Sequence, residues 1–181
     1  MGTCSDEVTY ACDLKFCGLG KVWIHTDFSN KAALQGGLVL DDALMDMYVK
    51  CGVLAKAQEV FNELLSRDVV SWNALIAGYS AQQKALEAFD CLKQMQSEGV
   101  LPNVVTSICI LKACGCTRNF EKGKQIHLEI VSYSWLEKDS VLGNTLVDMY
   151  AKCGFLAEAH EVFDELLEQD VVSYSVLIAG Y

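Results

Sequence analysis

The sequence has one proline in 181 residues, and it lacks any uninterrupted apolar run of the length that a membrane-spanning helix needs. So few helix breakers favour long helices that are joined by short turns. Hydrophobic residues make up 52% of the chain, enough to bury a substantial core, which excludes wholesale disorder. Basic residues are scarce, and the resulting net charge of −10 argues against a generic polyanion binder.

The nine cysteines include no Cys-x-x-Cys pair. Their odd number and wide spacing predict a reducing compartment, and Cys51 and Cys153 are expected to be small buried apolar residues.

His127 begins a His-x-Glu triplet, as in zinc deaminases, but the Pro-Cys-x-x-Cys half of that signature is missing. Cys114, Cys116 and His127 lack a fourth metal ligand. The sequence therefore predicts no cofactor and no catalytic site, so the chain is not expected to be an enzyme.

What the chain does have is an internal repeat. Residues 39–79 return as residues 141–181 at a spacing of 102 residues, and 27 of the 41 positions are identical. Such self-similarity is typical of repeat arrays, in which each unit contacts mainly its neighbours. Function is then expected along a surface that equivalent positions of successive repeats build, and not in a single pocket.

The 102-residue period divides into units that each hold two amphipathic helical stretches and a short break. This pattern predicts an all-α fold, a superhelical α-α solenoid of stacked helix-turn-helix repeats. The run VVSWNALIAGY is rich in strand-forming residues, but the helical period of the repeats overrules that composition. Four residues that precede apolar helical runs are predicted to be N-caps: Asp68, Asn103, Asp139 and Asp170. The units are 38–68, 69–103, 104–139 and 140–170, followed by the start of another at 171–181.

These units resemble the pentatricopeptide repeat. VVSWNALIAGY followed by LEAFDCLKQMQSEGVLPN is similar to the standard repeat, LKACGCTRNFEKGKQIH to its longer variant, and NTLVDMYAKCGFLAEAHEVFDELLEQD to its shorter one. The order short, standard, long, short resembles the triplet-organised (PLS) subclass that occurs chiefly in plant organelles. Residues 7–37 resemble a shortened, degenerate long-type unit. The resemblance implies a right-handed superhelix, and the chain is expected to be a fragment of a longer array.

The resemblance also implies binding of single-stranded RNA, with about one base read per repeat. The family reads a base with the fifth and last residues of a unit, and it wedges the second residue between neighbouring bases. Ile108, at the fifth position of the long unit, has no polar group, so no hydrogen-bonded readout is expected there. Carried over, the reading residues are Asn73 with Asn103, Asn144 with Asp170, Asp42 with Asp68, and Ser175; the wedging residues are Val39, Val70, Val141 and Val172.

The chemistry of these side chains agrees with that assignment. A carboxamide offers one acceptor and two donors, which suits the edge of a pyrimidine, so a pyrimidine is expected opposite 69–103. An Asp in the last position correlates with uracil in the family, which gives uracil opposite 140–170. Asp42 departs from the usual Asn at the fifth position. Lys50 and Lys152 follow the same DMY triplet and are candidates for phosphate contacts, or are simply exposed lysines near helix ends.

The leading interpretation is a sequence-specific single-stranded RNA-binding module within an organellar RNA editing or processing factor. Its partners would be RNA and other RNA-processing factors, with no membrane and no small-molecule substrate, and the family implies a mitochondrion or chloroplast. The main alternative is a helical scaffold that binds protein partners along its concave face, and a third is a degenerate array without a binding function. A groove that joins Asn73 and Asn144 to the valines and Lys152 would favour RNA, whereas acidic side chains there would favour protein.

Overall fold

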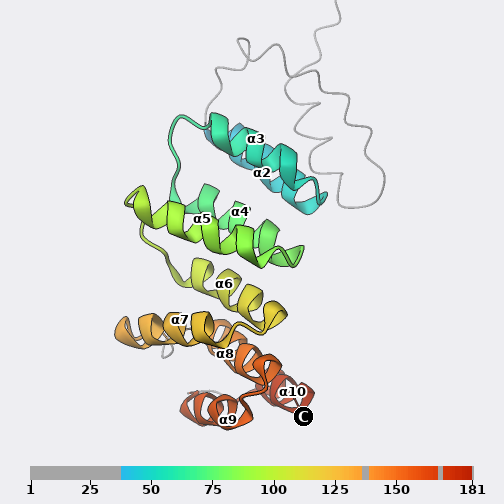
Figure 1. Cartoon of the computed structure of the whole chain (residues 1–181), viewed down its shortest axis with the longest axis vertical. Coiled ribbons are helices and arrows are strands. Elements are labelled where there is room, and N and C mark those ends of the chain that lie inside the picture. The colour runs from blue at the N-terminus through green and yellow to red at the C-terminus, as the bar shows by residue number, and fades with distance from the viewer. Residues whose placement is uncertain (1–37, 136–138, 167–168, 181) are drawn as a thin grey trace, which may run out of the picture.

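The computed structural model describes residues 38–135, 139–166 and 169–180, with side chains from residue 44 onward. Within these ranges the regular elements are all α-helices, so the predicted all-α fold is confirmed. The unit expected at 7–37 lies outside the described residues. The helices follow one another in pairs down the long axis of the molecule (Figure 1): α2 (Leu38–Lys50) with α3 (Leu54–Glu63), α4 (Val69–Ala81) with α5 (Ala85–Ser97), α6 (Val104–Thr117) with α7 (Phe120–Ser132), and α8 (Ser140–Cys153) with α9 (Leu156–Glu165), before α10 (Val171–Ala179).

The run with strand-like composition lies in α4, and its start is fixed by a side chain. Asp68 accepts hydrogen bonds from the backbone N–H groups of Val70 and Ser71, and the Ser71 hydroxyl accepts the backbone N–H of Asp68 in return. This reciprocal capping box satisfies donors that the helix itself leaves unpaired. All four predicted N-caps are confirmed, and three of them form the full box: Asp68 with Ser71, Asn103 with Thr106, and Asp170 with Ser173.

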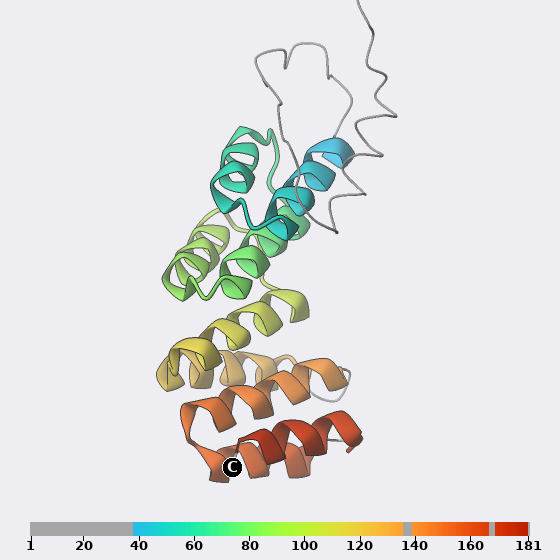
Figure 2. The same ribbon diagram turned by 90° about the vertical axis from the view of Figure 1, so that its right-hand side faces the viewer.

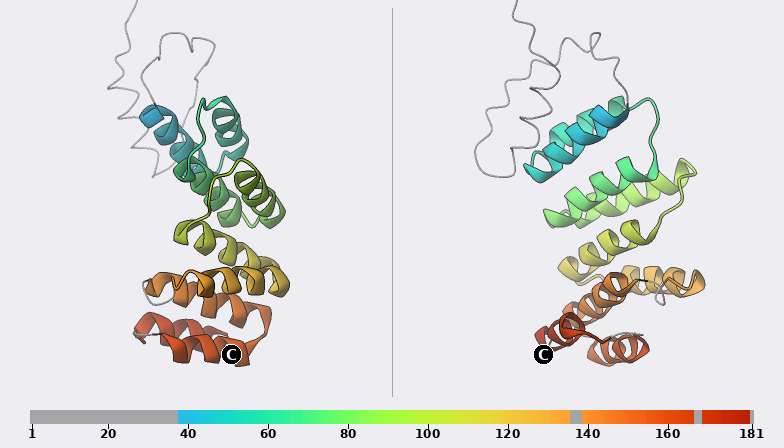
Figure 3. Two further views of the ribbon diagram at one scale, coloured as in Figure 1. Left: turned by 90° about the vertical axis from the view of Figure 1, so that its left-hand side faces the viewer. Right: turned by 180° about the vertical axis from the view of Figure 1, so that it is seen from behind.

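The stacking is carried by one helix of each pair. The first helices α2, α4, α6, α8 and α10 each contact the next in chain order, and we call them the first-helix row. Each second helix (α3, α5, α7 or α9) contacts its own partner and the following first helix. Among the helices that the structure describes, no second helix packs its backbone closely against another second helix, although side chains near their ends meet, as Phe120 of α7 and Phe155 before α9 do at 3.7 Å between ring centroids. Figures 2 and 3 show this layered arrangement from the sides and from behind.

The interfaces within this row and between each pair form one continuous apolar core. At its centre Trp72 is completely buried, and its ring meets the edge of Phe61 from the preceding pair at 4.5 Å between centroids. Cys51 and Cys153 were expected to be buried, and this prediction is wrong, because both lie at intermediate depth near the ends of their helices. In the described part of the chain, no helix combines the length and the apolar character needed to cross a bilayer.

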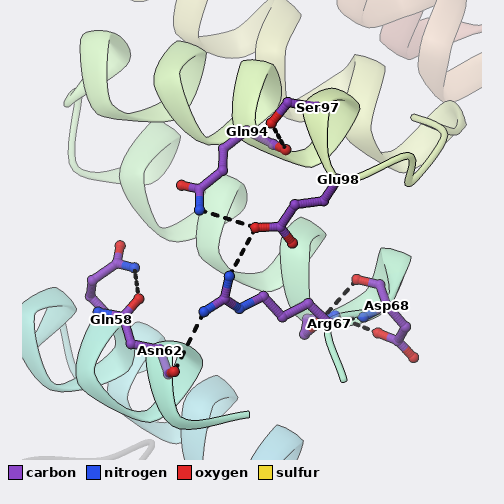
Figure 4. Close-up of polar contacts among 8 residues, drawn as sticks. Gln58, Asn62, Arg67, Asp68, Gln94, Ser97 and Glu98 are labelled. Atoms are coloured by element: carbon purple, nitrogen blue, oxygen red, sulfur yellow. Dashed lines mark hydrogen bonds and ion pairs between the residues drawn. The ribbon is translucent and has the colours of Figure 1, made fainter. Parts of the chain in front are cut away.

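An ion pair ties the loop between α3 and α4 to the next pair of helices (Figure 4). Arg67 Nη1 lies 2.9 Å from Glu98 Oε1, and Gln94 also donates to that carboxylate oxygen at 3.1 Å. The Arg67 guanidinium lies 5.0 Å from the centre of the Phe61 ring. Because both charged side chains are only 25% and 32% exposed, this contact is better shielded from water than an ordinary surface ion pair.

We therefore expect Arg67→Ala to lower the free energy of unfolding by about 1–2 kcal/mol, since it removes an ion pair and a cation–π contact together. Lys93→Ala is the control, because the Lys93–Asp90 pair is 71% and 74% exposed and should contribute less than about 0.5 kcal/mol. Urea unfolding followed by circular dichroism measures both. Equal losses in the two variants would show that Arg67 does not link the helix pairs.

Candidate nucleic-acid interface

Exposed valines recur at one position along the first-helix row. Val70, Val141 and Val172 are each the second residue of their helix, and they are 57%, 58% and 55% exposed. Val105 holds the same place in α6 and is 50% exposed. Sequence reasoning missed Val105 because attention in that unit fell on Ile108, although the same Val-Val dipeptide opens α4, α6 and α10. The Val39 side chain lies outside the described residues.

The structure brings one predicted reading pair into direct contact. Asn73 Nδ2 donates to Asn103 Oδ1 at 3.1 Å, although 30 residues separate the two. The Thr106 hydroxyl donates to Asn73 Oδ1 at 2.6 Å. Asn73 is 8% exposed, so its amide is nearly buried, and it already forms hydrogen bonds with Asn103 and Thr106. Residues from two successive helix pairs therefore build this polar cluster, which we call the Asn73 cluster (Asn73, Asn103 and Thr106).

The second predicted pair is not joined in the same way. Within the described residues, Asn144 Oδ1 is buried and has no hydrogen-bond partner. The Asp170 carboxylate instead accepts the backbone N–H and the hydroxyl of Ser173 at 2.8 and 2.9 Å. These hydrogen bonds hold the pKa of Asp170 below its ordinary value, so the group stays ionised and acts only as an acceptor.

The remaining predicted reading residues have other contacts. Asp68 uses its carboxylate to cap α4. Ser175 is exposed, and its hydroxyl donates to the Val171 carbonyl at 2.6 Å. Ile108 is half-buried and packs against the core, which agrees with its having no polar role. The side chain of Asp42 lies outside the residues that the structure describes.

The two candidate phosphate-binding lysines are paired with acids on their own helices. Lys50 Nζ lies 2.6 Å from Asp46, and Lys152 Nζ lies 2.6 Å from Asp148, four residues earlier in each case. Each lysine is 53% or more exposed, so it can reach solvent, but its charge is balanced. The first-helix row is therefore not strongly basic here, which limits the electrostatic attraction for a polyanion.

A hollow of about 440 Å³ lies beside Lys152 between the ends of α6, α8 and α10. Arg118 contributes to its lining, as does Asp148. Arg118 ends α6 in a left-handed conformation with φ of 53°, and sequence reasoning missed it because no repeat equivalent marks it. Asn144 and Lys152 are eight residues apart on α8, which places them about 12 Å apart along the helix axis. The amides of Asn73 and Asn144 thus lie near the N-terminal ends of the first helices, and the cations of Lys50 and Lys152 near the C-terminal ends.

The described residues give no support for a metal site or for a reactive thiol. Among the described residues, no three His, Cys, Asp or Glu side chains are grouped to hold a metal ion. Burial raises the pKa of the Cys114 thiol to about 12 and that of Cys91 to about 11, which disfavours the reactive thiolate. His127 Nδ1 lies 2.8 Å from the Tyr150 hydroxyl, so this histidine links α7 to α8.

This His127 contact predicts a pH dependence of stability. Burial lowers the pKa of His127 and outweighs the nearby Glu165, which raises it, while Nε2 is buried without a described partner. Because the folded-state pKa lies below the unfolded value of about 6.5, the unfolded chain binds more protons as the pH falls. The contribution of neutral His127 is therefore present above about pH 6.5 and is lost on acidification.

In the variant His127→Gln, we expect the free energy of unfolding to vary less between pH 5 and pH 7 than in the wild type. His160→Gln on α9 serves as the control, because it removes a histidine and leaves the contact with Tyr150 in place. Urea titrations at several pH values give the comparison. An unchanged pH slope in His127→Gln would contradict the assignment.

Comparison with known proteins is informative over most of the chain. The model of the PPR repeat family matches residues 67–116, and that of the PPR repeat matches residues 42–69 and 144–171. In Arabidopsis thaliana, the mitochondrial pentatricopeptide repeat-containing protein At1g06140 is 35% identical over 99% of this chain, and the chloroplastic protein At4g18520 is 37% identical over 98%. The chain spans 33% and 29% of the lengths of these two relatives.

Solved structures of a pentatricopeptide repeat protein resemble the fold of this chain. The pentatricopeptide repeat protein PPR10, solved in complex with an 18-nt psaJ RNA element, superposes with a TM-score of 0.74 at 19% identity, over 97% of this chain and 27% of that chain. The structure of PPR10 from maize gives a TM-score of 0.65 at 25% identity, over 80% of this chain and 22% of that one. The predicted stacked-helix architecture is thus shared with a solved repeat array.

Proposed function

Because this chain belongs to the pentatricopeptide repeat family, we propose that it is a sequence-specific module for single-stranded RNA. The observation that carries the proposal is the recurrence of an exposed valine at the second position of four successive first helices, each three residues before the position that reads a base in the family. One exposed valine needs no explanation, but valines at the same position of successive helices form a row of apolar side chains that can pack against bases. PPR10, the structural neighbour, was solved with an RNA element.

The proposed contacts follow the repeat. Val70 and Val105 would flank the base read by Asn73 and Asn103, and Val141 and Val172 would flank the base read by Asn144 and Asp170. The units follow the boundaries 38–68, 69–103, 104–139 and 140–170, and their order supports membership of the triplet-organised subclass. Lys50, Lys152 and Arg118 would lie toward the RNA backbone. We propose a location in a mitochondrion or chloroplast because relatives carry those locations in their names. The proposed role in an RNA editing or processing factor follows from the resemblance of the repeat order to the triplet-organised subclass.

Base choice gives the sharpest test of this function. Asn144→Ser should move the preference opposite residues 140–170 from uracil toward a purine, because the family pairs a small hydroxyl with purines. A discrimination of about 1–3 kcal/mol per base, as for good base contacts in general, corresponds to roughly 5-fold to 150-fold. Selection from a randomised RNA pool, with these units inside a longer array, measures the preference. Asn119→Ser, which keeps a capping residue on α7 outside the first-helix row, is the matched control.

An unchanged preference in Asn144→Ser, or an equal change in Asn119→Ser, would refute the assignment of Asn144.

The second candidate function is a scaffold for protein partners. It is favoured by the net charge of −10 and by the acids that balance Lys50 and Lys152. Failure of the chain to bind any RNA at low salt, where phosphate contacts are strongest, would favour that alternative.

A further inference from the structure

The polar contact that sets the Asn73 cluster apart comes from the following helix pair. Thr106, in the first turn of α6, is 1% exposed, and its hydroxyl oxygen lies 2.6 Å from Asn73 Oδ1. The same oxygen accepts the backbone N–H of Asn103 at 3.1 Å. A hydroxyl has one proton to donate, and Asn103 Oδ1 is farther away at 3.1 Å. The shorter distance assigns the Thr106 proton to Asn73 Oδ1.

Counting donors and acceptors shows what remains for a ligand. With Asn73 Oδ1 held by Thr106, and one Nδ2 proton given to Asn103, the amide keeps a single N–H. Asn103 Oδ1 already accepts the backbone N–H of Thr106 and the amide of Asn73, which leaves its own amide N–H groups. The cluster therefore offers mainly donors, namely one N–H of Asn73 and the amide N–H groups of Asn103, beside one lone pair that remains on Asn73 Oδ1. Its selectivity depends on which way the Asn73 amide is turned.

In the last unit that the structure describes, the equivalent residue Ser173 does not make this contact. Ser71 and Ser173 complete the same capping box, and among the described residues their side chains bond Asp68 and Asp170 respectively. Asn144 Oδ1, the counterpart of Asn73 Oδ1, is buried without a described partner. A bond from one helix pair to the fifth residue of the preceding unit is thus made by Thr106 and, within the described residues, not by Ser173. For Ser71 that fifth residue is Asp42, whose side chain lies outside the described residues.

We propose that Thr106 is a positioning residue for base reading by residues 69–103, a role that rests on the proposed RNA-binding function. By donating to Asn73 Oδ1, its hydroxyl holds the amide with its nitrogen toward Asn103 and toward the ligand. Without this hydroxyl, the buried oxygen loses its partner, and a half-turn of the amide presents an acceptor in place of a donor. The unit then tolerates base edges of both kinds. Thr106 itself would touch no RNA, since it is buried beneath Asn73.

The test compares Thr106→Val, which keeps the shape and removes the hydroxyl, with Thr106→Ser, which keeps the hydroxyl. Ser71→Ala and Ser173→Ala are matched controls, because they remove the same capping box where the structure shows no bond to an asparagine of the preceding unit. In the RNA-free chain, hydrogen exchange of the Asn73 side-chain amide is measured by NMR. We expect it to be about tenfold faster in Thr106→Val than in the wild type and in Thr106→Ser.

Fluorescence anisotropy at low salt then gives the dissociation constants for oligo(A), oligo(C) and oligo(U). The largest of the three divided by the smallest is the affinity ratio, which measures base selectivity. We expect the affinity ratio to decrease about fivefold in Thr106→Val, which corresponds to the free energy of one hydrogen bond. It should stay unchanged in Thr106→Ser, Ser71→Ala and Ser173→Ala. Circular dichroism confirms that each variant keeps its helices.

Two results would overturn the role of Thr106. One is an unchanged amide exchange and an unchanged affinity ratio in Thr106→Val. The other is an equal narrowing in Ser71→Ala and Ser173→Ala, which would trace the effect to the lost helix caps. If the wild-type chain bound none of the three oligonucleotides, both the base-reading role and the proposed function would fail. Amide exchange would still decide whether Thr106 holds Asn73.

Discussion

Replacing Trp72 by alanine is expected to lower the free energy of unfolding by about 3–5 kcal/mol, the range for large-to-small changes at buried aromatic sites. The Trp72 ring is completely buried between two helix pairs and packs edge-on against Phe61 at 4.5 Å. Its removal leaves a cavity in the core that joins α4 to α3. Because small domains have a total stability of about 5–15 kcal/mol, this one change removes a large part of it.

Two variants make the Trp72 prediction specific. Trp72→Phe should cost less than half as much, since the indole Nε1 is buried without a described hydrogen-bond partner and only ring volume is lost. Tyr174→Ala changes the equivalent residue of the second copy, which also meets a phenylalanine edge-on, at 5.0 Å, but is 50% exposed. It should cost about 1–2 kcal/mol, because half of its surface is already in water. Urea unfolding compares the three variants, and equal losses for Trp72→Ala and Tyr174→Ala would contradict the prediction.

Duplicating residues 69–170 within the chain should tighten RNA binding about 30-fold or more. The duplication is in register because residue 171 follows residue 170 as residue 69 follows residue 68 in the repeat. The chain has two clear reading pairs, and stacking or base contacts of about 1–3 kcal/mol each leave little after the costs of association. Its net charge of −10 adds repulsion. We therefore expect a dissociation constant no tighter than about 10 μM near physiological salt before duplication.

The gain comes from two more reading pairs, which contribute about 2 kcal/mol even at the lower limit of 1 kcal/mol each. The control is the same extended chain with Asn73→Ala and Asn144→Ala in the added copy only. It has the same length and charge, and it should gain little. Fluorescence anisotropy with one single-stranded RNA measures all three proteins. Submicromolar binding by the unextended chain would show that its affinity has another source.

The sequence predicted what depends on local pattern. Helical periodicity and the repeat spacing gave the all-α fold, and the capping roles of Asp68 and Asp170 followed from residue type and position. The ion pair between Lys152 and Asp148 could also have been predicted, since a spacing of four residues brings side chains together on a helix. Sequence reasoning treated Lys152 as a phosphate contact and missed the pairing with Asp148.

The Asn73 cluster lay beyond such reasoning. Its bonds join residues 30 and 33 positions apart, and they depend on how closely α4 and α6 pack. The residue type does not distinguish Thr106 from Ser71 or Ser173, because all three can complete a capping box. The half-buried position of Cys153 has the same kind of origin. The Cys153 thiol contacts Met149 on its own helix and the Cys114 carbonyl of α6, and the second contact follows from the stacking of α6 on α8.

The separation of the second helices gives the molecule an uneven stiffness. Bending that spreads or closes α3, α5, α7 and α9 strains only side-chain contacts near their ends, such as Arg67 with Glu98 and Phe120 with Phe155, whereas stretching the first-helix row would pull apart closely packed helices. The neutral line of bending therefore runs along α4, α6, α8 and α10. The distance from one exposed valine to the next stays nearly constant while the curvature changes. Such an array can follow a flexible strand around a bend and still keep the step between successive bases.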